Sequence, residues 1–166
     1  VLTHFQVASN ATLRIEPGVS VLFMGAFRFE TYGALAAAGA ADRPITFTSG
    51  FEGPWPGDWI GLQFKDSSDD ATCLLSNVVV EYARTGIDCA SASPSIVSSR
   101  IRHGTQQGIY LDHSSPLIQN CVIENNDNEG IYCVNRSSPD IFNNQIFGNQ
   151  YGIRLSAQTT TNQNCL

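Results

Sequence analysis

Lysine, long apolar runs and clustered positive charge are all scarce in this chain of 166 residues, and each scarcity excludes a class of protein. Lys65 is the only lysine beside eight arginines, and the formal net charge is -6, so the basic stripe that binds nucleic acid is missing. No window approaches 18 uninterrupted apolar residues, the least that a membrane-spanning helix needs. We therefore expect no nucleic-acid partner and no membrane span.

Metal-binding motifs and an initiator methionine are also missing. The five cysteines form no Cys-x-x-Cys pair and have no histidine at ligand spacing, so we expect no metal and no cofactor. The chain begins at Val1 without a signal peptide, which suggests a processed product, an excised domain or a trimmed chain. An apolar content of 42% over 166 residues is enough for one hydrophobic core, so we expect a single domain.

The most informative pattern is a Gly-Ile pair that recurs every 22 residues. A fixed period of this size is typical of a solenoid, in which one structural unit stacks on itself. Each isoleucine is followed two residues later by an apolar residue, and this alternation predicts a half-buried strand. The pairs are Gly86-Ile87, Gly108-Ile109, Gly130-Ile131 and Gly152-Ile153, and the apolar residues that follow are Cys89, Leu111, Cys133 and Leu155.

Two further apolar columns support the repeat. A proline precedes an isoleucine by two residues in Pro94/Ile96, Pro116/Ile118 and Pro139/Ile141. Another strand position is filled by Val79, Ile101, Ile123 and Ile146. A coil of about 22 residues has no room for a helix once these strands and their turns are counted. The unit is therefore a rung of a parallel β-helix, and leucine-rich or helical repeats are excluded.

These rungs resemble the right-handed parallel β-helix repeat family, the pectin-lyase-like solenoids. The matching stretches run from Ser115-Pro116-Leu117-Ile118-Gln119-Asn120 through Gly130-Ile131, and from Ser138-Pro139-Asp140-Ile141 through Leu155. We predict an all-β, right-handed parallel β-helix of roughly six to seven coils. The opening coils, such as Gly57-Asp58-Trp59-Ile60-Gly61-Leu62, look like those of bacterial secreted or cell-surface members, which implies a secreted or surface location.

One β-helix domain is expected to span residues 1–166. Within it we predict an N-terminal cap at 1–10, irregular opening coils at 11–64, regular coils at 65–155 and a C-terminal tail at 156–166. In the opening coils, alternating apolar residues are interrupted by glycine and proline, as in Val19/Val21/Phe23, and Leu13 lies 22 residues before Leu35.

The C-terminal tail is mostly polar, so we expect it to cover the last rung at Ile153 and Leu155 poorly. An uncovered rung edge is a template for association. The sequence therefore predicts either a homo-oligomer that pairs through this rung or a longer parent chain.

The outward column between the buried positions is the best candidate for a ligand surface. It contains Asp88, Tyr110, Tyr132 and Arg154, and adjacent rungs place these side chains about 5 Å apart. Tyrosine rings suit sugar rings, while the acid and the base could bind hydroxyls or a carboxylate. The alternative is an aromatic ladder that only stabilises an exposed sheet. Nearby polar candidates are Arg100, Arg102, His103, Asp112 and His113.

Catalysis would need more than this column provides. A lyase needs a base and a cation, and a hydrolase needs two carboxylates about 5 to 9 Å apart. Neither constellation forms a family signature here, and the turns between 86 and 155 are too short to wall a cleft.

The Gly/Pro-rich run from Ser49 to Asp58 could present Trp55 as a carbohydrate platform. Packing of Phe51 and Trp55 over a sheet face is the preferred interpretation, with Trp59 more structural than Trp55.

Cysteine and asparagine columns are interpreted as structural. Cys89 and Cys133 lie two rungs apart, roughly 9.6 Å, which is too far for a disulfide, so we expect core residues. Cys73 and Cys165 could pair or stay free.

Stacked amides are expected to form ladders at the corners, with contact to sugar hydroxyls as the alternative. The positions concerned are Ser98/Asn120/Asn143 and Asn126/Asn149.

Taken together, these patterns predict an extracellular β-helix module with a non-catalytic carbohydrate-binding role or a surface and structural role. A polysaccharide is the expected partner. The alternative is a polysaccharide lyase or glycoside hydrolase that acts on an extracellular polysaccharide.

Overall fold

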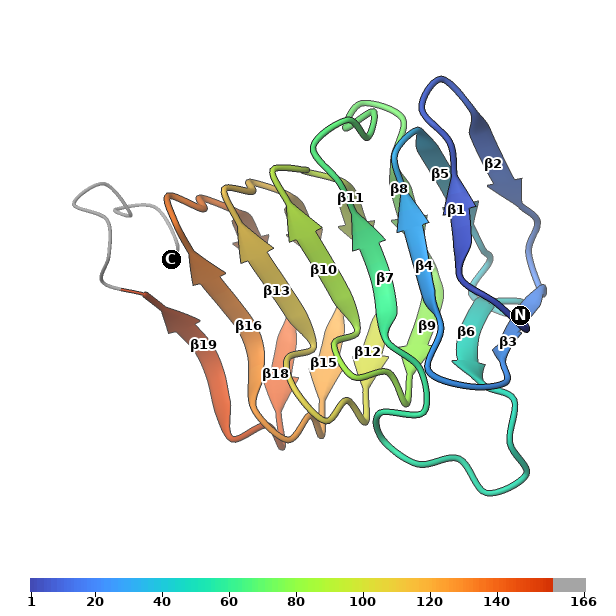
Figure 1. Cartoon of the computed structure of the whole chain (residues 1–166). Helices are drawn as coiled ribbons and strands as arrows, with labels where there is room; N and C mark the ends of the chain where they lie inside the picture. The colour runs from blue at the N-terminus through green and yellow to red at the C-terminus, as the bar shows by residue number, and fades with distance from the viewer. Residues whose placement is uncertain (157–166) are drawn as a thin grey trace.

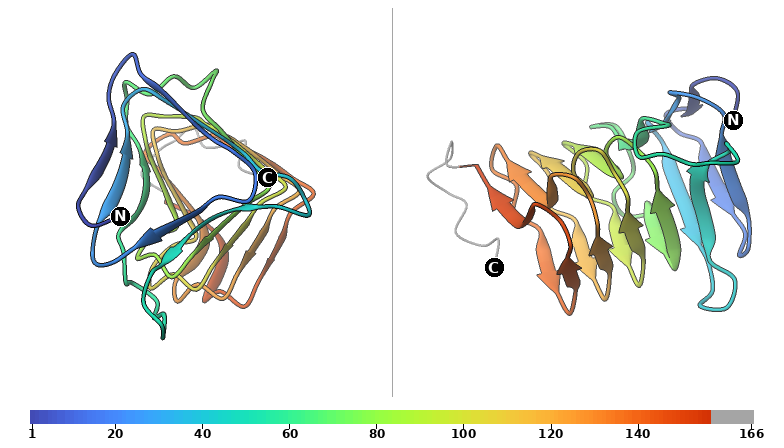
Figure 2. Two further views of the ribbon diagram at one scale, coloured as in Figure 1. Left: turned by 90° about the vertical axis from the view of Figure 1, so that its right-hand side faces the viewer. Right: turned by 90° about the horizontal axis from the view of Figure 1, so that it is seen from below.

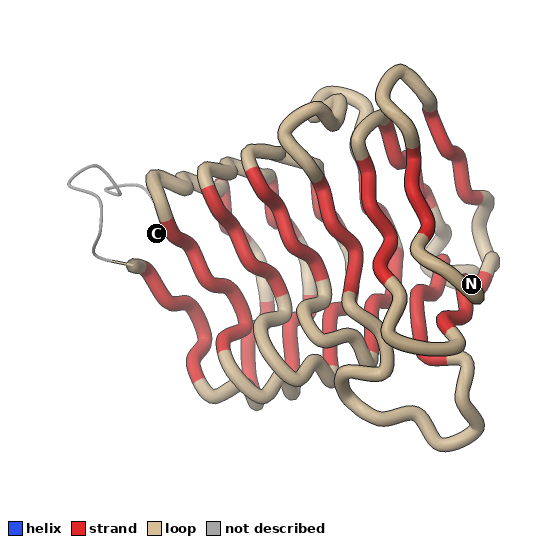
Figure 3. Tube along the Cα trace, viewed as in Figure 1, coloured by secondary structure: helices blue, strands red, loops and turns tan. Residues whose placement is uncertain are grey.

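The computed structural model describes residues 1–156, which form a solenoid of parallel strands without a helix (Figures 1 and 3). Three parallel sheets run along its length, and the view along the solenoid is roughly triangular (Figure 2). We call them sheet A, with seven strands, and sheets B and C, with six strands each. The predicted all-β fold of six to seven stacked coils is confirmed.

The strands enter the three sheets in turn along the chain. Sheet A contains β1 (Phe5–Val7), β4 (Arg28–Thr31), β7 (Gly61–Phe64), β10 (Ile87–Ala90), β13 (Ile109–Asp112), β16 (Glu129–Val134) and β19 (Tyr151–Leu155). Sheet B contains β2 (Thr12–Ile15), β5 (Ala34–Ala38), β8 (Leu74–Ser76), β11 (Ser95–Val97), β14 (Leu117–Gln119) and β17 (Asp140–Phe142). Sheet C contains β3 (Ser20–Phe23), β6 (Ile45–Ser49), β9 (Val78–Glu81), β12 (Arg100–Arg102), β15 (Val122–Glu124) and β18 (Gln145–Phe147).

Three isoleucines of the Gly-Ile column lie in the hydrophobic core, as predicted. Ile87, Ile109 and Ile131 are in register on β10, β13 and β16 and are fully buried. A Cβ on Gly108 would lie 2.8 Å from the backbone oxygen of Gly130 in the next coil. Glycine is therefore required before the buried isoleucines of this column, because it allows neighbouring coils to approach closely at this corner.

The cysteines of the described residues are also part of the core. Cys89 and Cys133 are fully buried, with Leu111 in register between them, which confirms their interpretation as core residues. Burial raises the pKa of the Cys89 thiol well above its ordinary value, so this side chain stays protonated and packs as a small hydrophobe. Cys73 is buried too, whereas Cys165 lies outside the described residues.

Corner side chains differ between the two predicted asparagine columns. Asn126 and Asn149 form the predicted ladder, because Asn126 Nδ2 donates to Asn149 Oδ1 at 2.9 Å. Ser98, Asn120 and Asn143 instead occupy left-handed turn positions between sheets B and C, with φ of 49°, 54° and 58°. Asparagine adopts this conformation more readily than most residues, which explains two of the three.

Two valines do not occupy the inward positions that the pattern predicts. Val80 pairs with Ile101 and is fully buried, whereas Val79 pairs with Arg100 and faces outward. The turns in this coil are one residue shorter than in the regular coils, so a strict 22-residue step from Ile101 selects the wrong valine. Val19 is 40% exposed rather than inward, because it precedes β3, which begins at Ser20.

Both ends of the described solenoid are edge strands. The expected cap at 1–10 contains β1, which pairs with β4 and continues sheet A. At the other end, Ile153 and Leu155 on β19 are 40% and 41% exposed. Apart from Ser156, the expected C-terminal tail lies outside the described residues.

Candidate functional site

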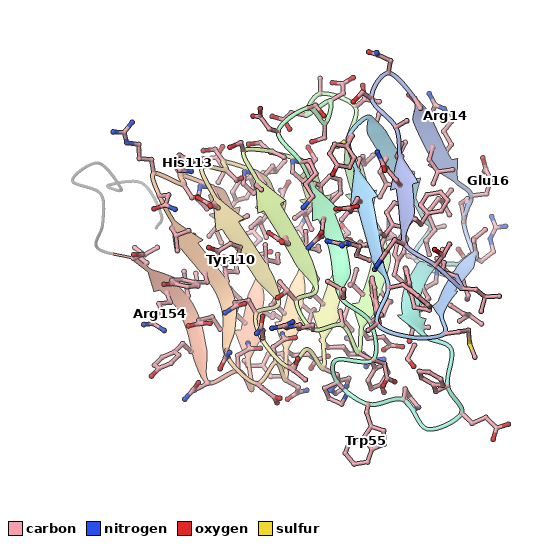
Figure 4. The ribbon with its side chains drawn as sticks, in the orientation of Figure 1. Arg14, Glu16, Trp55, Tyr110, His113 and Arg154 are labelled. Atoms are coloured by element: carbon pink, nitrogen blue, oxygen red, sulfur yellow. The ribbon has the colours of Figure 1, made fainter. Side chains whose placement is uncertain are left out.

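The outward column predicted as a ligand surface lies on four adjacent strands of sheet A. Asp88 on β10 pairs with Tyr110 on β13, and Tyr110 pairs with Tyr132 on β16. Tyr132 in turn pairs with Arg154 on β19. We call these four residues the sheet A strip; Figure 4 labels Tyr110 and Arg154 on this sheet. The sequence therefore correctly predicted which residues come together on this face.

The two tyrosine rings of the sheet A strip are steeply inclined to each other and do not form a flat surface. The ring centroids of Tyr110 and Tyr132 are 5.7 Å apart, and the ring planes meet at 66°. The guanidinium carbon of Arg154 lies 5.2 Å from the Tyr132 centroid and 5.6 Å from that of Tyr151. Edge-to-face rings and a cation near an aromatic face attract one another, so these side chains stabilise a defined surface.

A buried carboxylate fixes Arg154. Arg154 Nη1 donates to Glu129 Oε1 at 2.8 Å, and Gln107 Nε2 donates to Glu129 Oε2 at 2.9 Å. Burial alone would raise the pKa of Glu129, but these hydrogen bonds outweigh it and lower the pKa below its ordinary value. The Glu129 side chain is only 4% exposed, while that of Arg154 is 53% exposed and accessible to a ligand.

At the other end of the strip, the sheet adds polar residues that sequence reasoning missed. Gln63 on β7 pairs with Asp88 and donates to its Oδ2 at 3.2 Å, while Lys65 Nζ donates to Gln63 Oε1 at 3.1 Å. Burial raises the pKa of Asp88, and Lys65 and Gln63 offset only part of this effect. The coil between Gln63 and Asp88 is longer than 22 residues, so the fixed period does not identify Gln63. The same period could have identified Glu129, because it lies 22 residues after Gln107.

Asp112 and His113 lie beside the strip. Asp112 follows Tyr110 by two residues on β13, and its Oδ1 accepts a hydrogen bond from Asn135 Nδ2 at 2.8 Å. His113 Nδ1 lies 2.8 Å from the same oxygen. These residues form a polar cluster at the C-terminal end of β13, next to Tyr110.

Arg102 and His103, which the sequence placed near the strip, lie elsewhere. Arg102 is on β12 of sheet C, where its Nε donates to Glu81 Oε2 at 2.8 Å. His103 follows that strand at the corner between sheets C and A and stacks on Tyr82, with centroids 5.3 Å apart. Both side chains bridge neighbouring coils and are separate from the sheet A strip.

A comparison with protein families agrees with this architecture. The family model described as the right-handed beta helix region matches residues 55–166. The chain belongs to the right-handed beta helix family. No curated protein and no solved structure matches the chain. Membership in the right-handed beta helix family accounts for the fold and its handedness.

The loop between β6 and β7 of this β-helix differs from the expectation. Phe51 and Trp55 are 45% and 74% exposed, so the prediction that both pack over a sheet face is wrong. Asp58 Oδ2 accepts hydrogen bonds from Ser49 Oγ at 2.6 Å and from the Trp55 amide at 2.9 Å, which holds the loop with Trp55 directed outward (Figure 4). Trp59 is fully buried and stacks on Phe23, and its structural role is confirmed.

The sheet A strip is an open surface. Two hollows lined by described residues lie away from it, one of about 260 Å³ between sheets B and C and one of about 380 Å³ at the N-terminal end.

Within residues 1–156, no helix is long and apolar enough to cross a membrane. The same residues contain no group of three His, Cys, Asp or Glu side chains placed to hold a metal ion.

Proposed function

We propose that this right-handed β-helix is a non-catalytic module that binds an extracellular polysaccharide through the sheet A strip. The observation that carries the proposal is the unbroken register of Asp88, Tyr110, Tyr132 and Arg154 across four strands. Two partly exposed rings provide apolar faces for sugar rings, and the acid and the base at either end can bind hydroxyls.

The shape of the strip favours an extended ligand. Rungs are about 4.8 Å apart, so the strip is about 14 Å long from Asp88 to Arg154. Within residues 1–156, neither the Tyr110 nor the Tyr132 hydroxyl forms a hydrogen bond, so both can bind a ligand. An open surface of this length fits several residues of a polysaccharide chain running along the solenoid.

Charge favours a neutral polysaccharide over an acidic one. The chain carries a net charge of -6, which repels polyanions on average. Arg154 is already paired with Glu129, and Asp88 adds a further acid to the strip. A neutral chain needs only hydroxyl contacts and ring faces, which the strip supplies.

A glycan array that contains neutral and acidic polysaccharides tests the proposal on the unmodified protein. We expect binding to one or more neutral polysaccharides and weaker or no binding to polyuronates. If no glycan binds, the carbohydrate-binding role is contradicted and the surface or structural role takes its place.

A polysaccharide lyase or glycoside hydrolase is the second candidate, and the cluster beside Tyr110 is the observation that favours it. A histidine that is hydrogen-bonded to a carboxylate is a suitable general base, and His113 lies 2.8 Å from Asp112. Product formation from a panel of polyuronates and neutral polysaccharides tests this candidate. It requires products from the parent and their loss in His113→Gln; a parent that forms none contradicts it.

A further inference from the structure

The hollow at the corner between sheets B and C has a regular floor. Asn77, Ser98 and Asn120 occupy the same left-handed turn position on three successive coils, with φ of 48°, 49° and 54°. Beside them lie the outward residues of sheet C, which are Val79, Arg100 and Val122. The floor therefore combines a polar turn column with a sheet C column in which apolar and charged residues alternate.

A short hairpin forms a wall over this floor. Its two sides are joined by an isolated antiparallel bridge, in which the backbones of Ala40 and Arg43 form hydrogen bonds of 3.1 and 3.0 Å. The hairpin is tied to the floor, because Ile45 N donates to Asn77 O at 3.2 Å and Asn77 Nδ2 donates to Gly39 O at 3.3 Å. A Cβ on Gly39 would lie 2.4 Å from Asn77 O, so glycine is needed for this close contact. The wall is thus held in place without a ligand.

The exposed groups of the hollow match a hydroxylated ligand. Within residues 1–156, the Ser98 hydroxyl and the Asn120 amide side chain are exposed and have no hydrogen-bond partner. The Arg100 side chain is 47% exposed, and its charge is balanced by Glu124 at 3.4 Å. Because that balance reduces the attraction for an anion, the site favours a neutral ligand that both donates and accepts hydrogen bonds.

We propose that this corner groove, lined by the hairpin and by Asn77, Ser98, Arg100 and Asn120, is a second binding site that takes a sugar residue of a neutral saccharide. Its volume of about 260 Å³ is slightly below the range of pockets for drug-sized ligands, which suits one sugar residue. The corner groove lies on a different part of the solenoid from the sheet A strip. Binding there does not depend on the strip.

Nuclear magnetic resonance with soluble neutral hexasaccharides tests the corner groove. The probes are cello-, xylo-, manno- and malto-hexaose at about 10 mM, a concentration that detects millimolar affinity. We expect at least one probe to shift the backbone amide signals of Ala41, Ser98 and Asn120. The proposal is overturned if none of the four probes shifts these signals, or if the shifts are confined to the sheet A strip.

Matched variants test whether the groove side chains make the contact. Asn120→Gly removes an amide that lines the groove, whereas Asn143→Gly makes the same change one coil further on, outside it. Glycine tolerates the left-handed turn, so neither variant should unfold. We expect affinity to fall about tenfold for Asn120→Gly, the effect of one or two lost hydrogen bonds, and to stay unchanged for Asn143→Gly. Equal affinity in both variants contradicts the site.

A blocking variant separates the two sites. Val79→Phe places a ring over the groove floor, and Leu74→Phe is its control on the outer face of sheet B in the same coil. We expect Val79→Phe to abolish the shifts at Ser98 and Asn120, while Leu74→Phe and the double variant Tyr110→Ala/Tyr132→Ala retain them. Loss of the groove shifts in the tyrosine variant alone would place the ligand on the strip and overturn the corner groove. Failure of the groove leaves polysaccharide binding at the strip untouched.

Discussion

Asn149 Oδ1 accepts two hydrogen bonds from Asn126, one from its backbone amide and one from its side-chain Nδ2, each at 2.9 Å. A side chain of one coil thus satisfies the backbone of the coil before it. The same device occurs at the other two corners, where the Ser114 amide donates to Ser137 Oγ and the Cys121 amide donates to Asn144 Oδ1. Polar corner residues therefore connect the coils where the strand ladders end.

Asn126→Ala is expected to destabilise the solenoid by about 1 to 3 kcal/mol. The Gly104 amide donates to Asn126 Oδ1 at 2.9 Å. Removing the Asn126 side chain leaves this buried amide without a hydrogen-bond partner. Urea unfolding measures the free energy, and Asn128→Ala, in a half-exposed side chain nearby, should change it little. Equal stability of the Asn126 variant and the parent would show that the ladder does not hold the coils together.

Truncating isoleucines of the Gly-Ile column should have effects that depend on position in the stack. Ile109→Ala should cost about 2 to 5 kcal/mol, because Ile109 is fully buried and the change leaves a cavity. Ile153→Ala should cost less than about 1.5 kcal/mol, because this side chain is 40% exposed. Similar costs for the two variants, measured by urea unfolding, would contradict the assignment of Ile109 to the centre of the core.

Asp88→Asn should make the folded protein more stable at neutral pH. Burial raises the pKa of Asp88 in the folded state. The unfolded chain therefore ionises more easily, and the folded protein loses stability as the pH rises from the ordinary carboxyl range, near 4, towards the raised pKa. The gain should be below about 1 kcal/mol, because the side chain keeps some exposure to solvent, and it should vanish near pH 3. Unfolding of parent and variant at both pH values measures it. A gain that grows on acidification would have the wrong sign, and the exposed Asp127→Asn serves as control.

The two tryptophans should report opposite environments. Trp59→Phe leaves only Trp55, which is 74% exposed, so emission should shift to longer wavelength and iodide should quench it strongly. Trp55→Phe leaves only the fully buried Trp59, whose fluorescence should be shielded from iodide. Equal quenching of the two single-tryptophan proteins would contradict the outward position of the loop.

The regular coils could be predicted from the sequence because their geometry repeats without change. Each Gly-Ile pair is in register with the next, as in Ile87, Ile109 and Ile131, and the outward residues between buried positions follow automatically. This is why the sheet A strip was identified correctly.

Features that depend on loop length or on corner geometry could not be predicted in this way. The fixed period misses Gln63 because the coil between it and Asp88 is longer than 22 residues, and the choice between Val79 and Val80 depends on a turn that is one residue shorter. The exposure of Trp55 depends on hydrogen bonds to Asp58, which no periodic pattern contains. His103 lies close to the strip in sequence, but a corner separates it from sheet A.

The affinity of the protein for a neutral polysaccharide, compared among the parent and two double variants, tests the central claim most directly. Tyr110→Ala/Tyr132→Ala removes both rings of the sheet A strip, while Phe142→Ala/Phe147→Ala removes two exposed rings from sheets B and C. We predict that the tyrosine variant folds like the parent but loses binding to that polysaccharide on the strip, and that the phenylalanine variant keeps it. Undiminished binding by the tyrosine variant, or no binding by the parent, would contradict the assignment of the strip as a polysaccharide site.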